Sequence, residues 1–351
     1  MARNMIFWLS RGVDGFRADA IPYLWKEEGT ACENEPKTHL VVKFLRAVVD
    51  YFRSNTLLLA EACQVPGQVV KYFGEGDECH AGYHFPLMPQ IFKSMAMKNR
   101  EPIANILSPL VTPEIPEGCQ WFTFLRCHDE LSLELVYVSE EDRKYIHDVY
   151  CRFPEWDFRL GQGISARLSE LMDLDPGRIT FIYSIMLTLP GTPVIYYGDE
   201  FGKANDEPYY EKMIQLSGKD DSRFLVRGYI DWKALEAKLN DPGSLASRVF
   251  YALSRQIEAR QQYPAFGRGR IEWFDIFEED GSVNQQLLAY TRIYGQQQIF
   301  VLHNLSDKPM TFIIPEGMKI EGDFDLLGKE IDLLERIFRM KPLDYQWILL
   351  G

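Results

Sequence analysis

Three acidic residues stand directly after short apolar runs that we interpret as β-strands, and their types and spacing could support acid–base chemistry. Arg17 and Asp19 are two residues apart on the first of these strands, so both side chains point to the same side. An arginine beside a carboxylate favours the ionised form that a nucleophile requires. Glu61 follows the apolar run LLLA, a position that favours the protonated form of a general acid. Asp129 follows His128 on a later strand, and the two could hold substrate hydroxyl groups.

These residues need strands and helices that bring them together. The first eleven residues predict a helix that ends at a glycine, and residues 13–19 predict a short buried strand. Strand patterns follow at residues 56–60, 81–85, 121–125 and 193–197, and helical patterns at residues 38–52, 178–189 and 247–262. Strands that alternate with helices predict parallel βα units, whose carboxyl ends form one face of the sheet or barrel. The sequence therefore predicts that the acidic residues converge at that face.

Each candidate residue also has a purely structural interpretation. A single strand-end carboxylate is more often part of a buried salt bridge or a helix cap, and only the convergence of several indicates a site. Glu200 is better explained by pairing with a buried arginine, and His84 is explained equally well as a hydrogen-bonded core histidine or as a pocket residue. Asp220, Asp221 and Arg223 most resemble a solvated loop.

Composition excludes several classes of protein. The 351 residues are 46% hydrophobic and 25% charged, which is typical of globular proteins. The formal net charge of −13 would repel nucleic acid, and no basic block offsets it. We expect no membrane partner, because no run of about 18 apolar residues is present. The chain start does not resemble a signal peptide, which favours a cytoplasmic protein. The six cysteines form no C-x-x-C pair and no Cys/His cluster with ligand spacing, so we expect reduced thiols and no metal.

Several segments together resemble a known family. The segments GFRADA, LLLAEA and RCHDE, in this order, resemble three signature regions of the alpha-amylase family of retaining glycoside hydrolases and transglycosidases. The segment GTPVIYYGDE resembles the last barrel strand of that family, so the resemblance extends from about Met5 to Gly202. Within the family, the segments PYLWKEEGTACENEPKTH, HFPLMP and PEIPEGCQWFTFLR resemble the trehalose synthases, which are maltose α-D-glucosyltransferases.

The resemblance implies a role for each candidate residue. Asp19 would be the nucleophile, Glu61 the general acid/base and Asp129 the transition-state stabiliser, while Arg17 and His128 would bind substrate. The implied reaction cleaves an α-linked glucose disaccharide or oligosaccharide through a glycosyl-enzyme on Asp19. Transfer or isomerisation of a maltose-like disaccharide then requires that water be excluded. Hydrolysis of an α-glucan or α-glucoside is an alternative within the same family.

The resemblance also implies an architecture. It places the start of the chain just before the fourth barrel strand, so we expect an α/β fold in two parts. Residues 1–264 would form the C-terminal part of a (β/α)8 TIM barrel (strands 4 to 8), and residues 265–351 a small antiparallel β-sandwich domain. The family's calcium site would lie in the N-terminal part, so we expect no cofactor here. The partner would be that missing barrel part or a second chain, and a truncated, non-catalytic sugar- or subunit-binding remnant is a further alternative.

Two departures from the family pattern concern the predicted substrate pocket. Cys127 stands where related enzymes commonly have asparagine before the His-Asp pair, and a thiol is a weak hydrogen-bonding group. After the last predicted barrel strand, DEPYYEKMIQLSGKDDSRFLVRGYIDW replaces the segment expected of a trehalose synthase. The sequence therefore predicts an acceptor side that differs from that of the trehalose synthases.

Overall fold

The computed structural model describes residues 1–278 and 280–351, which form two compact units. Unit 1 consists of Met1–Leu87 and Ile106–Thr123, and unit 2 of Met88–Asn105 and Phe124–Gly351. The predicted domain boundary at residues 264 and 265 lies inside unit 2 and stays a prediction. Among the described residues, no helix is both long enough and apolar enough to cross a membrane.

Unit 1 is organised around neighbouring parallel strands. Strand β1 pairs with β2, β2 with β3, and β3 with β4. The register sets Ala18 beside Ala60, so the residues after β1 and β2 leave the sheet at the same edge. The strands are β1 (Gly15–Ala18), β2 (Leu57–Ala60), β3 (Ala81–Tyr83) and β4 (Gln120–Phe124). This arrangement confirms the predicted parallel βα units for the first part of the chain.

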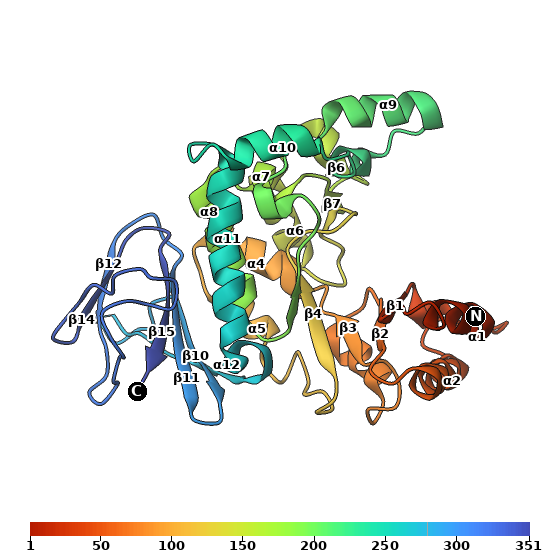
Figure 1. Ribbon diagram of the computed structural model, residues 1–351, viewed down its shortest axis with the longest axis horizontal. Coiled ribbons are helices and arrows are strands. Elements are labelled where there is room, and N and C mark those ends of the chain that lie inside the picture. Colours follow the sequence, from red (N-terminus) through yellow and green to blue (C-terminus); the bar gives the residue numbers. More distant parts are fainter. Residues whose placement is uncertain (279) are drawn as a thin grey trace. The chain divides into compact units, whose positions relative to one another are not determined.

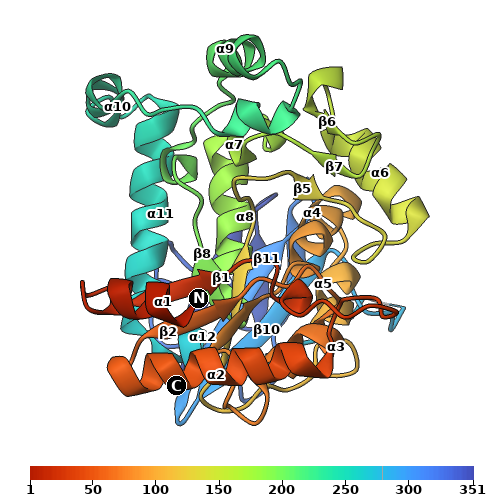
Figure 2. The same ribbon diagram turned by 90° about the vertical axis from the view of Figure 1, so that its right-hand side faces the viewer.

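Helix α2 (Pro36–Phe52) covers this sheet because its apolar positions recur at helical spacing. A proline at its first turn is compatible with the helix start, since the missing N–H has no partner there in any case. Figure 2 shows α2 running alongside β1 and β2, with helix α1 (Ala2–Leu9) next to it. The buried residues of α2 are Thr38, Val42, Leu45 and Val49.

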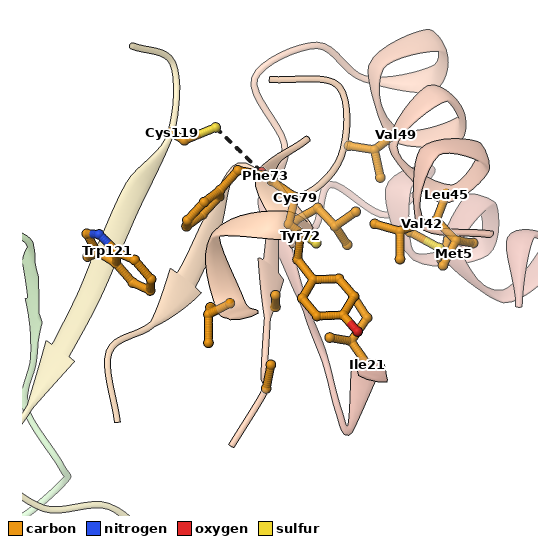
Figure 3. Packing of buried hydrophobic residues seen from close by; sticks show 14 residues of the cluster. Met5, Ile21, Val42, Leu45, Val49, Tyr72, Phe73, Cys79, Cys119 and Trp121 are labelled. Atoms are coloured by element: carbon orange, nitrogen blue, oxygen red, sulfur yellow. Dashed lines mark hydrogen bonds between the residues drawn. The ribbon is translucent and has the colours of Figure 1, made fainter. Parts of the chain in front are cut away.

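The core of unit 1 lies between α2 and the sheet (Figure 3). Phe73 packs edge-on against Trp121, with 5.3 Å between the ring centroids. Phe73 belongs to the helical turns that link β2 and β3, and Trp121 belongs to β4. The contact therefore packs the connection between β2 and β3 against the sheet. The thiol of Cys119 donates a hydrogen bond to the carbonyl of Cys79 (3.6 Å). The linking helical turns are η1 (Ile21–Tyr23), α3 (Pro66–Val69) and η2 (Val70–Phe73).

Unit 2 contains a long helix that is buried on all sides. Every residue of α8 (Pro176–Thr188) from Ile179 onward is buried, and α11 (Leu245–Gln262) packs along it (Figure 1). Both helices confirm predicted segments. The other helical elements after β3 are α4 (Leu87–Met97), α5 (Glu101–Ile106), α6 (Glu140–Tyr150), η3 (Pro154–Trp156), α7 (Leu168–Leu171), η4 (Asp199–Phe201), α9 (Glu207–Ser217), η5 (Ser222–Val226), α10 (Trp232–Leu239) and α12 (Pro264–Arg268).

The strands of unit 2 are short until the C-terminal region. Strand β7 (Gly163–Ile164) pairs antiparallel with both β5 (Leu131–Ser132) and β6 (Asp157–Phe158). Strand β8 (Thr192–Val194) follows α8 and is shorter than the predicted strand over residues 193–197. Beyond the end of this strand, the rings of Tyr196 and Tyr197 lie against the guanidinium group of Arg167.

The C-terminal region confirms the predicted antiparallel tail. Strands β10 and β11 form a hairpin with a two-residue turn, where Gly295 has the positive φ that such a turn requires. Both C-terminal sheets contribute to one apolar core, in which Phe300 and Phe338 are fully buried. One sheet contains β9 (Arg270–Trp273), β10 (Leu287–Tyr294), β11 (Gln297–Asn304) and β15 (Tyr345–Leu350), and the other β12 (Met310–Ile313), β13 (Leu333–Leu334) and β14 (Ile337–Met340).

Candidate active site

Unit 1 brings Arg17, Asp19 and Glu61 together. Arg17 is on β1, Asp19 directly follows this strand, and Glu61 directly follows β2. One guanidinium nitrogen of Arg17 donates to the carboxylate of Asp19 at 2.6 Å. A second nitrogen lies 3.5 Å from the carboxylate of Glu61. The arginine therefore links the two carboxylates that the sequence predicted to converge.

Backbone geometry holds Glu61 in this position. Its carboxylate accepts a 2.6 Å hydrogen bond from the backbone N–H of Ala20, and its own N–H donates to the carbonyl of Ala18 (3.0 Å). Ala20 has φ 47° and ψ 43°, a left-handed conformation that a residue with a side chain adopts only at some cost. The thiol of Cys63 donates to the other oxygen of Glu61 (3.2 Å). Glu61 is thus fixed by groups from both strand ends.

Exposure distinguishes the two carboxylates. The side chain of Asp19 is 75% exposed and that of Glu61 only 14%. For Arg17, burial disfavours the charged form, but the hydrogen bond to Asp19 and the charges of Glu61 and Asp19 outweigh burial and raise its pKa. Arg17 therefore stays a cation between them. The pair therefore has one carboxylate open to solvent and one that is shielded.

Unit 2 places Asp129 in a cluster of charged groups. One carboxylate oxygen of Asp129 accepts hydrogen bonds from Arg223 (3.2 Å) and Arg227 (2.7 Å). Its other oxygen lies 3.2 Å from Nε2 of His128, and Arg227 also donates to the carbonyl of His128 (2.7 Å). The buried Arg126 donates to the backbone carbonyl of Asp129 (2.8 Å). The His-Asp pair predicted from the sequence therefore sits among three guanidinium groups.

The sequence analysis did not predict that Arg223 and Arg227 belong to this site. Arg223 is part of η5 and belongs to the group that we interpreted as a solvated loop, an interpretation that the structure corrects, and Arg227 directly follows η5. The guanidinium of Arg223 donates two hydrogen bonds of 2.8 Å to the carboxylate of Asp221, which hold that side chain in one orientation. The hydrogen bond with Asp221 raises the pKa of Arg223, against the effect of burial. No sequence spacing indicated this contact, because 94 residues separate Arg223 from Asp129.

Cys127 lies beside this cluster. Its sulfur accepts a hydrogen bond from the backbone N–H of Asp129 (3.4 Å), which is the kind of bond that a side-chain oxygen would make more strongly. Burial raises the pKa of the Cys127 thiol, so at neutral pH it stays protonated. The residue supports the backbone of the His-Asp pair.

The structure decides between the two alternatives for His84, a core histidine and a pocket residue. Its side chain is 2% exposed and packs edge-on against Trp121, with 5.0 Å between ring centroids. Nε2 lies 2.8 Å from the hydroxyl of Thr112, and Nδ1 accepts a hydrogen bond from the backbone N–H of Leu87 (3.2 Å). His84 is therefore a core histidine with both nitrogens engaged.

Near the end of β8, the buried ion pair involves a different residue from the one expected. Asp199 lies 3.3 Å from Arg167, and both side chains are essentially buried. Glu200 instead accepts a hydrogen bond from the backbone N–H of Gly198 (2.6 Å). The interpretation of Glu200 as the partner of a buried arginine was wrong by one residue, because the 3-10 turn η4 directs Asp199 inward.

Comparisons with known proteins agree with the parallel strands that carry acidic residues at their carboxyl ends. Residues 1–133 match the family described as "Alpha amylase, catalytic domain", and residues 287–328 match "Alpha-amylase SusG C-terminal domain". The chain belongs to the alpha-amylase family. Over the whole chain, a crystal structure of an alpha-amylase from H. orenii has the same fold, with a TM-score of 0.69 at 18% identity and 63% of that chain covered.

Curated relatives extend the comparison along most of the chain. A trehalose synthase/amylase of Mycobacterium tuberculosis is 39% identical over 333 residues, which cover 86% of this chain and 52% of that protein. A glucosylglycerate phosphorylase of Escherichia coli is 26% identical and covers 99% of this chain and 62% of that protein. The chain thus spans about half the length of the trehalose synthase/amylase that it matches.

Proposed function

We propose that this chain carries the catalytic carboxylates of a retaining enzyme that transfers glucosyl groups or isomerises maltose-like disaccharides. Asp19 is the nucleophile, Glu61 the general acid/base and Asp129 the transition-state stabiliser, with Arg17 and His128 as substrate-binding partners. The observation that carries the proposal is the bridge from Arg17 to both Asp19 and Glu61 at the ends of two adjacent strands. Retaining glycosidases need such a pair of nearby carboxyl groups.

The reaction that we propose has two steps. Asp19 attacks the anomeric carbon while Glu61 gives its proton to the leaving oxygen, which produces a glycosyl-enzyme and a free sugar. Glu61 then takes a proton from the acceptor hydroxyl, which attacks the same carbon and releases Asp19. Attack by a different hydroxyl of the released glucose would convert one disaccharide into its isomer. Similarity to trehalose synthases along most of the chain supports this outcome. We further propose that β1, β2, β3, β4 and β8 correspond to strands 4 to 8 of the family's barrel.

A second candidate is transfer of the glucosyl group to phosphate. Arg223 and Arg227 both donate to Asp129 through their guanidinium groups, and guanidinium groups also bind phosphate oxygens well. Their segment replaces the one expected of a trehalose synthase, and a glucosylglycerate phosphorylase is among the relatives. A phosphate oxygen would attack the anomeric carbon of the glycosyl-enzyme and break its bond to Asp19. The product would be glucose 1-phosphate, and the carboxylate of Asp19 would be free again. This alternative differs from the first only in the acceptor.

Product analysis tests both candidates. The chain is incubated with maltose, without and with phosphate, and the sugars are identified by NMR spectroscopy. We expect a non-reducing isomer or transfer products in excess of glucose. Glucose 1-phosphate formed only with phosphate would favour the second candidate, and glucose alone would favour hydrolysis.

Two variants test whether the activity comes from this site or from a contaminating enzyme. Asp19→Asn should lose all product formation. The matched control is Asp14→Asn, since Asp14 is an exposed aspartate just before β1 that pairs with Arg53. Loss of product in both variants, or in neither, would contradict the assignment of Asp19.

A further inference from the structure

A second cluster of chemically reactive side chains lies in unit 2, apart from the residues that we assign to the reaction. It consists of His147, Cys151 and Asp157, and one ligand atom from each lies within 4.8 Å of the others. Nε2 of His147 and a carboxylate oxygen of Asp157 are 2.8 Å apart. The sequence spacing did not predict this group, because Asp157 comes from a different element.

Local structure explains why the three side chains meet. His147 is in the last turn of α6 and Cys151 is the residue that ends this helix, so one helical turn separates them and both lie on the same face. The chain then reverses through η3, where the buried Trp156 accepts a backbone hydrogen bond from Ser165 (2.7 Å). This anchor places Asp157, the first residue of β6, against the end of α6.

The three atoms form a set that suits one transition-metal ion. Imidazole nitrogen, thiolate sulfur and carboxylate oxygen are the ligands that zinc takes in proteins, at about 2.0 to 2.3 Å. Ligands of one tetrahedral zinc lie roughly 3.5 Å apart, so small side-chain rotations suffice. Ca²⁺ and Mg²⁺ prefer sites made of oxygen atoms. The cluster therefore favours zinc over those ions.

Electrostatics at the cluster favours a cation, because the carboxylate of Asp157 brings a negative charge beside His147 and Cys151. The carbonyl groups at the end of α6 also attract positive charge. The side chains of His147 and Asp157 are 25% and 28% exposed, which leaves a path for an ion and room for a water ligand.

Another triplet in unit 2, Cys127, His128 and Asp129, has similar ligand types but opposite surroundings. Asp129 already accepts hydrogen bonds from Arg223 and Arg227, whose positive charges oppose a divalent cation. Asp157, in contrast, accepts only from His147 and the backbone N–H of Gly161 (2.8 Å) among the contacts described for it. Charge thus selects one triplet over the other.

We propose that His147, Cys151 and Asp157 bind one zinc ion, with water as the fourth ligand. Binding replaces water on the metal by the three side chains, and the thiol proton is released to the solvent. The ion would join the end of α6 to β6. The next residue of β6, Phe158, lies under the guanidinium of Arg223 at 5.0 Å, so the zinc would also stiffen the support of the Asp129 cluster.

Metal titration of the full chain tests the proposal without any activity assay. After treatment with a chelator, the protein is titrated with Co²⁺ by absorption spectroscopy and with Zn²⁺ by calorimetry. We expect one equivalent of each metal, a near-ultraviolet thiolate-to-cobalt charge-transfer band, and displacement of Co²⁺ by Zn²⁺ but not by Ca²⁺. Zinc should also raise the melting temperature.

Variants locate the ion. Cys151→Ser should remove the charge-transfer band, and His147→Gln and Asp157→Asn should each weaken binding by roughly 10-fold or more. Cys32→Ser, in unit 1, serves as the matched control and should bind as the parent protein does. Circular dichroism of the metal-free variants checks that each is folded. Unchanged binding in Cys151→Ser, or loss of binding in Cys127→Ser instead, would overturn the proposal.

Discussion

The protonation of His84 should control the acid stability of unit 1. The hydroxyl of Thr112 donates to the carbonyl of Ile106 (2.6 Å), so it must accept from Nε2–H of His84. Nδ1 in turn accepts from the backbone N–H of Leu87. Both nitrogens of the neutral ring are therefore satisfied, and a second ring proton would have to face an N–H group. Burial lowers the pKa of His84 from 6.5 to about 4, and a backbone hydrogen bond opposes this shift in part.

The size and sign of the effect follow from this pKa. The unfolded chain binds a proton at His84 more readily than the folded protein does. The contribution of His84 to folding stability is therefore fully present above pH 6.5 and is lost as the pH falls toward about 4. The whole difference between the folded and the unfolded pKa corresponds to about 3 kcal/mol. Of this, roughly 2 kcal/mol should be lost between pH 7 and pH 5.

Urea unfolding at pH 7 and pH 5 measures this loss. The parent protein and His84→Gln are compared, because glutamine does not titrate and because the difference between them cancels other ionisable groups. We expect the free energy of unfolding to fall by about 2 kcal/mol more in the parent protein. Thr112→Val is the matched control, since it removes the hydroxyl partner but keeps the imidazole and hence the steep pH dependence. The reasoning would be refuted by an equal pH dependence in the parent protein and His84→Gln.

Three further predictions concern the candidate active site. Asp19→Asn should abolish trapping of a glycosyl-enzyme by an activated fluoroglycoside, as measured by intact mass, while circular dichroism stays unchanged because Asp19 is exposed; a persistent adduct would contradict its role as nucleophile. Glu61→Gln should slow natural disaccharides by about 10²- to 10⁴-fold and activated substrates far less, since these need no leaving-group proton; equal losses would make Glu61 structural. Arg227→Ala should lower kcat/KM by about 10- to 100-fold, because Asp129 loses a 2.7 Å hydrogen bond that orients it. An unchanged rate would show that Arg223 alone positions Asp129, and the exposed Arg270→Ala is the control.

The sequence by itself determined the elements and the local motifs. Apolar spacing over residues 38–52 predicted α2, and the runs before Asp19 and Glu61 predicted β1 and β2, because helix and strand periodicity depend only on neighbouring residues. The order of the motifs also indicated the alpha-amylase family. Since parallel strands leave a sheet at one edge, the meeting of Asp19 and Glu61 was predictable from their positions after those strands.

Tertiary structure alone decided which distant side chains complete each cluster. Arg227 reaches Asp129 across 98 residues from a segment whose own pattern resembles a surface loop. His147 and Asp157 meet because the chain reverses at η3, and the reversal depends on packing of the buried Trp156. Such contacts depend on how elements pack in three dimensions, and the free energy of that packing is shared among many residues. Such contacts therefore cannot be predicted from any short segment of the sequence.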